Sequence, residues 1–433
     1  MSSELYLLGR LNQKSFIRNR KMPFPRMIVF IINFVKKSLQ LELNSFTDLC
    51  GDDFDITKQA FSKSRHNLSP IVFKLLNEKL VLEVYSDNEI KMFKEFRIFA
   101  IDGSTVRLPM SEELYKEYGF DEKNKSVPLA KTSVLYDVLN HITKHAILQS
   151  YDANERDMAT EHILELCKFD DSIEGDHIGD IIMFDRGYPS LFLIFFMISK
   201  NKDFVMRCSS VFLSEINAVV KAGWRDTIIT IPAFKEKRIP SPSFAKYLPH
   251  LKKNAVLQLR VLRFDLSSGE QEVIVTSLTD QNLFTYGDFF TLYGKRWNNE
   301  EAYKLYKCIA EIENFSGKSK IAVEQDFHAT IFSCNLASIL MQEAQEEVEQ
   351  EQLIKEENGE RGKYKYAYKI NRNVLIGTIK NEIIPMLLSD CDLTEYCEKF
   401  KKRIKKSLVP IRPGRSFERI HRRRKKQVNR RAL

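Results

Sequence analysis

The sequence predicts an α/β fold flanked by helical regions, and three observations support this. Apolar residues recur at helical spacing over residues 1 to about 90, for example in "PRMIVFIINFVKKSLQLELNSF". From about residue 96, short apolar runs typical of strands alternate with amphipathic segments typical of helices. Beyond about residue 340 the pattern is helical again and ends in a basic tail. A chain of 433 residues has room for several domains, each with its own core.

Charge is distributed unevenly along the chain. The net charge is +9, but residues 398–433 contain sixteen Lys or Arg and two Glu, a local balance of +14. Such a tail is typical of an arm that binds nucleic acid or another polyanion, although a tail that only keeps a protein soluble has the same composition. The seven cysteines form no C-x-x-C pair, and the longest apolar runs have eight or nine residues. We therefore expect an intracellular protein with reduced thiols, no zinc site and no membrane span.

Residues 1–90 are expected to form a helical DNA-binding domain. Within them, "DITKQAFSKSRHNL" predicts a short helix capped by Asp55 or Thr57. Its polar side carries Lys63 and Arg65, and a preceding helix and "CGDD" turn are typical of a helix-turn-helix. We interpret Lys63 and Arg65 as DNA contacts. The alternative is the solvated face of an ordinary helical bundle.

The chain from residue 91 predicts a three-stranded meander, a helix and a strand that returns to the sheet. "FRIFAIDGSTVRLP" is typical of a strand that ends at Asp102, and "KTSVLYDVLN" and "HAILQSYD" of two further strands. "ERDMATEHILELC" predicts an amphipathic helix, and "DIIMFDRGY" a buried strand that ends at Asp185. This order is compatible with a ribonuclease-H-like α/β core. Asp137, within the second strand, is expected to be structural.

Strand-like runs such as "DTIITIPAF" and "QEVIVTSL" interrupt this core, and they define the expected domain boundaries. The ribonuclease-H-like catalytic core is expected to comprise residues 91–203 and 286–340, with a β-rich insertion at residues 204–285. Residues 341–362 are rich in Glu and are expected to form an acidic linker or helix end. Residues 363–433 are expected to form C-terminal helices and the basic tail.

Three acidic residues are candidate metal ligands. Asp102 and Asp185 end predicted strands, and strand-end carboxylates gather at one edge of an α/β sheet. Together with Glu300 they would supply the oxygen ligands that Mg²⁺ prefers. Two such ions, about 3.5–4 Å apart, would activate an attacking oxygen and stabilise a leaving one at a phosphodiester. Taken singly, each acid has a structural explanation: an Asp before Gly is usually a turn former, and Glu300 would be a surface acid of a helix.

The segment "YGKRWNNEEAYKLYK" predicts a helix on which Arg296, Glu300 and Lys307 share one face. One carboxylate flanked by two long cations and the ring of Tyr293 is suited to a metal-bound phosphate chain. The alternative is a stripe of i,i+4 salt bridges, each worth only about 0.2–0.5 kcal/mol. That alternative would leave the two strand-end Asp residues unexplained.

The same segment resembles a known signature. Its spacing reproduces the Y-(2)-R-(3)-E-(6)-K pattern of DDE transposases of the insertion-sequence-four (IS-four) family, with Trp297 and Glu301 adjoining. "AIDGSTVRLP" and "FDRGYPS" resemble the family's segments around the first and second Asp. "EVIVTSLTD" resembles its strand before the signature helix. The resemblance covers most of residues 15–340.

The resemblance implies cut-and-paste transposition of an insertion sequence. Asp102, Asp185 and Glu300 would bind two Mg²⁺ (or Mn²⁺) ions per active site. These would support phosphodiester hydrolysis at the element ends and transfer of the 3′-OH strand into target DNA. The other expected DNA contacts are Tyr293, Arg296, Lys307, Arg186, Trp297, Trp224, Arg422, Arg423 and Arg424. For Trp224, which would stack on an extruded base, an ordinary core or surface position is the alternative.

The expected partners are double-stranded DNA, as inverted-repeat ends and as target, and a second copy of the chain in a homodimer on DNA. The expected location is the bacterial cytoplasm, nucleoid-associated when DNA is bound. Two alternatives remain open. One is a ribonuclease-H-like DNA nuclease without strand transfer, and the other is a domesticated DNA-binding protein that no longer cuts.

Overall fold

The computed structural model describes residues 3–18, 20–33, 36–51, 55–86, 90–123, 127–172, 178–232, 256–265, 269–358, 366–388 and 393–412. The chain divides into two compact units, which are described separately. The helical unit comprises Met1–Leu80, Val106–Ala130 and Lys304–Leu433, and the sheet unit comprises Val81–Thr105 and Lys131–Tyr303. Within the described ranges, no helix is both long and apolar enough to cross a membrane.

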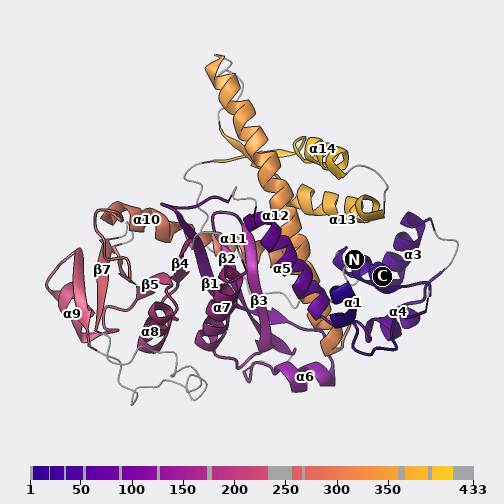
Figure 1. Ribbon diagram of the computed structural model, residues 1–433, viewed down its shortest axis with the longest axis horizontal. Coiled ribbons are helices and arrows are strands. Elements are labelled where there is room, and N and C mark those ends of the chain that lie inside the picture. Colours follow the sequence, from indigo (N-terminus) through magenta and orange to yellow (C-terminus); the bar gives the residue numbers. More distant parts are fainter. Residues whose placement is uncertain are drawn as a thin grey trace. The chain divides into compact units, whose positions relative to one another are not determined.

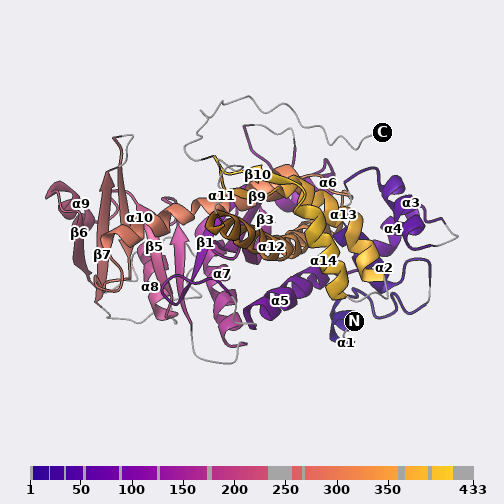
Figure 2. The ribbon, with the colours of Figure 1, turned by 90° about the horizontal axis from the view of Figure 1, so that it is seen from above.

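An eight-stranded sheet forms the core of the sheet unit. Its strand order is β3-β2-β1-β4-β5-β8-β7-β6, and the labelled strands of Figure 2 follow one another in this order from β6 to β3. The strands are β1 (Phe96–Arg107), β2 (Leu129–Asp137), β3 (Ile142–Ser150), β4 (Gly179–Phe184), β5 (Asp203–Cys208), β6 (Asp226–Ile231), β7 (Leu257–Asp265) and β8 (Gln271–Thr276).

The centre of the sheet is parallel. β1 and β4 pair in parallel from Phe96↔Gly179 to Ile101↔Phe184, and β4 pairs in parallel with β5. Helix α7 (Glu155–Asp170) connects β3 to β4, and α8 (Leu191–Ser199) connects β4 to β5. The prediction of a mixed α/β fold is therefore confirmed. A meander followed by a strand that returns beside β1 is compatible with a ribonuclease-H-like core.

The strands of the predicted β-rich insertion belong to this same sheet. β8 pairs antiparallel with β5, β7 with β8, and β6 with β7, so that the segment extends the sheet on the side of β5. β5 was not among the predicted strands, and it begins at Asp203, beside the predicted start of the insertion at residue 204. The helix that follows β8 is α10 (Tyr286–Lys295), which begins with a capping box between Thr285 and Asp288.

The predicted helix over residues 293–307 is not continuous. Arg296 separates α10 from α11 (Trp297–Lys304), and Leu305–Ile309 form a π-helical turn. A π turn widens the helical repeat, so residues on either side of it lose the spacing of an α-helix. The prediction that Arg296, Glu300 and Lys307 share one α-helical face is therefore wrong for Lys307, which lies within the π turn.

The helical unit begins with the helices predicted for the N-terminal region. Thr57 caps α4, where its Oγ1 accepts a hydrogen bond of 3.2 Å from the Ala60 N–H, as the sequence suggested. The helices of this unit are α1 (Ser3–Leu8), α2 (Phe24–Ile32), α3 (Leu39–Leu49), α4 (Lys58–Arg65), α5 (Ile71–Ser86, which continues into the sheet unit), α6 (Glu112–Tyr118), α12 (Lys320–Glu357), α13 (Arg372–Leu388) and α14 (Leu393–Ile404). A two-stranded sheet pairs β9 (Tyr368–Ile370) with β10 (Leu408–Pro410).

Most of the predicted acidic linker is part of the long helix α12, beside which α13 and α14 lie in Figure 1. The Glu347 carboxylate forms ion pairs with Lys401 of α14 (3.0 Å) and with Lys405, directly after this helix (2.7 Å). Lys405 also pairs with Glu351 at 2.9 Å. The acidic stripe of α12 is thus partly neutralised by the basic helix α14.

A buried ionic cluster joins the starts of β1, β4 and β5. Arg97 Nε lies 2.7 Å from Asp180 Oδ1, and the Lys202 ammonium lies 2.5 Å from Asp180 Oδ2. Both cations also pair with Asp170, at the end of α7. Asp180 is 1% exposed, so either cation without it would be a charge buried without full compensation.

We expect Asp180→Ala to lower the free energy of unfolding by about 3–5 kcal/mol, because it leaves two buried cations with Asp170 as their shared carboxylate partner. The control is Lys168→Ala, which removes an exposed ion pair with Glu165 and is expected to cost less than about 1 kcal/mol. Urea denaturation of the full chain measures both. Equal stabilities for the two variants would contradict a structural role for the cluster.

Candidate active site

Asp102 and Asp185 are brought together by the parallel pairing of β1 and β4. The last paired residues are Ile101 and Phe184, and Asp102 and Asp185 come directly after them. Because neighbouring strands lie about 4.8 Å apart, the two Asp residues are adjacent in space. Asp185 follows the end of β4, as predicted. Asp102 does not end its strand as predicted, since β1 continues to Arg107 beside β2 after β4 has ended.

The environment of these two carboxylates favours a cation. Burial raises the pKa of Asp102 from 3.8 to about 6; the Gly103 N–H and Arg296 oppose this shift, whereas Asp185 and Glu155 add to it. Asp185 Oδ1 is buried and has no hydrogen-bond partner. Two neighbouring half-buried carboxylates, one with a buried oxygen that has no hydrogen-bond partner, fit a hard divalent ion, which prefers oxygen ligands and relieves their repulsion.

Glu300 does not complete a three-residue cluster with this pair. In the part of the chain that the structure describes, no three His, Cys, Asp or Glu side chains are grouped so that they could hold a metal ion. Arg296 is nevertheless influenced by all three acids. Burial lowers the pKa of Arg296, but Tyr293, Asp185, Asp102 and Glu300 raise it, and the net shift is upward.

Helix α11, which carries Glu300, is attached to the sheet by three side chains that the sequence analysis missed. Tyr303 donates a hydrogen bond of 2.9 Å to the main-chain oxygen of Asp102. Asn299 donates to a main-chain oxygen of β1 (3.4 Å) and Asn298 to one in the turn after β2 (3.0 Å). No pattern in the sequence distinguishes these residues from the polar face of a solvated helix.

The other residues of the signature differ in their surroundings. Tyr293 is 4% exposed, its hydroxyl is buried without a hydrogen-bond partner, and burial raises its pKa. Arg296 is 5% exposed, with its guanidinium carbon 5.5 Å from the centre of the Tyr293 ring. Lys307 is half-buried in the π turn and belongs to the helical unit. Trp297 begins α11, and its side chain is not described.

Glu155 is a further acid beside Asp102 that the sequence analysis missed. It is the first residue of α7, its charge contributes to the raised pKa of Asp102, and Lys131 Nζ lies 4.0 Å from its carboxylate. A Cβ added at Gly103 would lie only 3.0 Å from Glu155 Cδ. In the sequence Glu155 is an ordinary acid in a first helical turn.

Asp137, by contrast, is structural, as predicted. It is fully buried and accepts hydrogen bonds from the Tyr85 hydroxyl, from the Asn140 side chain, and from the main-chain N–H groups of Leu139 and Asn140. It therefore fixes the turn between β2 and β3.

Two exposed residues were predicted to contact DNA from the sheet unit. Arg186 follows Asp185 and is exposed. Trp224 lies between α9 (Ser214–Lys221) and β6, and is 58% exposed. Of the positions considered for Trp224, the core is therefore excluded.

Residues 94–336 match the family model described as "Transposase DDE domain". The chain belongs to this family. The match contains Asp102, Asp185 and Glu300, and it bears out the predicted DDE transposase. None of the curated proteins matches the sequence. Among solved structures, the chain is similar to one described as "Cryo-EM structure of piggyBac transposase synaptic complex with hairpin DNA". The identity is 11%, over 95% of this chain and 82% of that chain, with a TM-score of 0.42.

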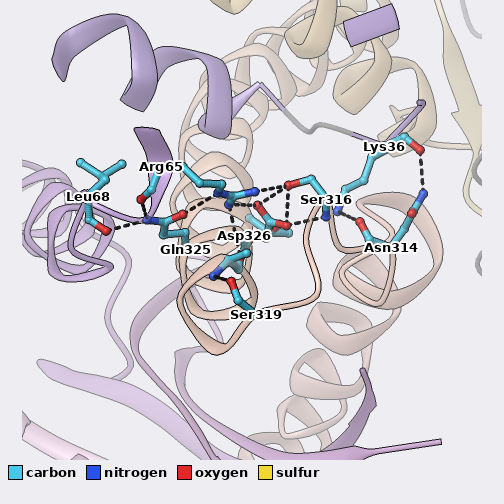
Figure 3. Close-up of polar contacts among 10 residues, drawn as sticks. Lys36, Arg65, Leu68, Asn314, Ser316, Ser319, Gln325 and Asp326 are labelled. Carbon is cyan, nitrogen blue, oxygen red and sulfur yellow. Dashed lines mark hydrogen bonds and ion pairs between the residues drawn. The ribbon is translucent and has the colours of Figure 1, made fainter. Parts of the chain in front are cut away.

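Outside the transposase DDE domain, the predicted DNA contacts of α4 differ from each other. Lys63 is exposed, but Arg65 is 2% exposed. Figure 3 shows its guanidinium surrounded by Ser316, Gln325 and Asp326. It donates to Gln325 Oε1 (2.8 Å) and Ser316 Oγ (2.7 Å), and forms an ion pair with Asp326 (2.9 Å). Contrary to the prediction, Arg65 is thus not available to a DNA phosphate and instead attaches α4 to the start of α12. Arg422, Arg423 and Arg424 lie outside the described residues.

The raised pKa of Asp102 lowers the stability of the metal-free protein near neutral pH. Since the folded-state pKa (about 6) exceeds the ordinary value of 3.8, metal-free protein loses stability as pH rises through this range. We expect Asp102→Asn to stabilise it at pH 7.5 by up to about 3 kcal/mol, from 1.36 kcal/mol per pKa unit. The gain should shrink below pH 6 and disappear below about pH 4.

Thermal or urea unfolding of the full chain in the presence of a chelator measures this effect. Asp152→Asn is the control, because Asp152 is exposed and its neutralisation should change stability little at any pH. An Asp102→Asn variant that is no more stable than the wild type at pH 7.5 would show that the ionised Asp102 does not lower the free energy of unfolding.

Proposed function

We propose that the chain is a transposase of the IS-four family that moves an insertion sequence by cut-and-paste transposition. The observation that carries this proposal is the adjacency of Asp102 and Asp185 on parallel strands, inside a segment that matches the transposase DDE domain. The Y-(2)-R-(3)-E-(6)-K spacing of residues 293–307 supports the finer assignment.

Asp102, Asp185 and Glu300 are proposed to hold two Mg²⁺ or Mn²⁺ ions. When bound, such ions activate an attacking oxygen and stabilise a leaving oxygen at a phosphodiester. The buried Asp185 Oδ1 without a partner and the raised pKa of Asp102 support cation binding. Glu300 would approach the pair as a third ligand when the ions are bound.

Further cationic and aromatic groups are proposed to hold the DNA ends. Arg296, influenced by all three acids, would bind a phosphate beside the reacting one. Tyr293 would donate its unpaired hydroxyl to the same strand. Lys307 and the exposed Arg186 would bind flanking phosphates. Trp224 and Trp297 are candidates for stacking on unpaired bases.

DNA binding outside the site is assigned to the N-terminal domain, residues 1–90, and to the basic tail. The exposed Lys63 on α4 would contact DNA, whereas Arg65 fixes the helix that presents it. We propose that residues 91–203 and 286–340 form the catalytic core, that residues 204–285 form a strand-rich segment within it, and that residues 363–433 form the C-terminal region. The active form is proposed to be a homodimer on paired element ends, in the bacterial cytoplasm.

A strand-transfer assay decides between this proposal and its alternatives. The substrate is a DNA fragment that carries the inverted repeats flanking the coding region, incubated with full-length protein, Mg²⁺ and a target plasmid. A transposase cuts the ends and joins them to the plasmid. Cutting without joining would indicate a nuclease, and binding without cutting would indicate a domesticated DNA-binding protein.

Glu300→Gln is expected to lower cleavage by at least about a thousandfold while leaving end binding nearly unchanged, because it removes a ligand charge without altering shape. The control is Glu165→Gln, which alters a half-buried acid on α7 that lies in an exposed ion pair. Gel-based cleavage and mobility-shift assays measure the two effects. Cleavage by Glu300→Gln at the rate of the control would exclude Glu300 from the site.

Deletion of residues 413–433 is expected to weaken DNA binding and to reduce its dependence on salt. Each lost phosphate contact should reduce the magnitude of the negative slope of log K against log[salt] by about 0.9. Binding titrations measure this slope between about 50 and 200 mM salt, where the affinity of DNA-binding proteins changes strongly. A slope equal to that of the full chain would show that the tail does not contact phosphates.

A further inference from the structure

The main-chain oxygen of Asp102 accepts hydrogen bonds from two hydroxyl groups that come from different elements. Tyr303 of α11 donates to it at 2.9 Å, and Ser133 of β2 donates to it at 3.2 Å. Both lone pairs of this carbonyl are therefore used. It is an unusual concentration of side-chain donors on the backbone of a strand, since most strand carbonyls are occupied by their neighbours in the sheet.

The Ser133 side of this arrangement is held rigidly. Ser133 is fully buried, and its Oγ lies 3.1 Å from Nε2 of His162, which is also fully buried. Nδ1 of His162 lies 2.9 Å from Nδ1 of His145. Burial lowers the pKa of His162 to about 3, so its ring is neutral. If Nε2 carries its proton, His162 donates to Ser133, and the Ser133 proton is directed to the Asp102 oxygen.

The Tyr303 side connects this fixed point to Glu300. Tyr303 lies three residues after Glu300 on α11, so the two side chains leave neighbouring parts of one helical surface. Asn299 donates to the oxygen of Ala100, two residues before Asp102 on β1. Side chains of α11, which carries Glu300, are therefore hydrogen-bonded to the backbone of β1, which carries Asp102.

We propose that Tyr303 is a positioning residue whose hydroxyl, bonded to the Asp102 carbonyl, sets the place of Glu300 relative to Asp102 and Asp185 and so strengthens divalent metal binding. This inference rests on the proposed function, since it takes the three acids as the metal ligands. Groups that orient metal ligands without touching the ion typically change metal affinity by 10- to 100-fold.

The test is Mn²⁺ binding to the full-length protein without DNA, measured by electron paramagnetic resonance of the free ion. Tyr303→Phe removes one oxygen and leaves the ring in place. We expect it to weaken Mn²⁺ binding by about tenfold. An affinity equal to that of the wild type would overturn the inference.

The matched control is Tyr286→Phe. Tyr286, on the neighbouring helix α10, also donates its hydroxyl to a main-chain oxygen, that of Arg263 at 2.5 Å, but this contact is not to a strand that carries a candidate ligand. Both variants should lower the melting temperature to a similar extent, and only Tyr303→Phe should alter Mn²⁺ affinity. Equal losses of affinity in both variants would show a general structural effect and overturn the inference.

A second comparison asks whether Tyr303 acts through Glu300. In a Glu300→Gln background, Tyr303→Phe should cause no further loss of Mn²⁺ affinity, because the ligand that it places is already removed. A full tenfold loss in that background would overturn the inference while leaving the proposed function intact. If the wild type binds no Mn²⁺ at all, the proposed function fails together with it.

Discussion

The parallel pairing of β1 with β4 is the constraint on which the rest of the site depends. At one end of this pairing, Arg97 stands opposite Asp180 in a buried ionic cluster that stabilises the fold. At the other end the same register sets Asp102 beside Asp185, two like charges whose proximity opposes folding. One pair of strands therefore combines a favourable electrostatic interaction with an unfavourable one. A bound cation would offset the second, as is common where function requires like charges to meet.

At Asp102, the main chain and the side chain have different roles. Its carboxylate is influenced by Asp185 and Glu155, whereas its main-chain oxygen is held by Ser133 and Tyr303. These two contacts do not use the carboxylate oxygens, of which Oδ1 accepts a hydrogen bond from the Gly103 N–H (2.9 Å). In the helical unit, Arg65 has a comparable supporting role, since its buried contacts with Asp326 attach α4 to α12.

Local patterns in the sequence predicted the parts of the structure that local chemistry determines. The run "IIMF" before Asp185 required a buried strand, and Thr57 identified the start of a helix, and both are confirmed. The strand beyond Asp102 was missed because "DGS" favours a turn, whereas pairing with β2 keeps the chain extended. Arg65 was misjudged because its partner Asp326 is 261 residues away. Neither partner is marked by any local pattern.

The most direct test of the account is a crystal structure of the full chain grown with MnCl₂, with anomalous scattering recorded at the manganese edge. We expect a manganese peak about 2 Å from carboxylate oxygens of both Asp102 and Asp185. Ordered carboxylates at these two positions with no manganese between them, in crystals grown with excess MnCl₂, would contradict the proposed metal site.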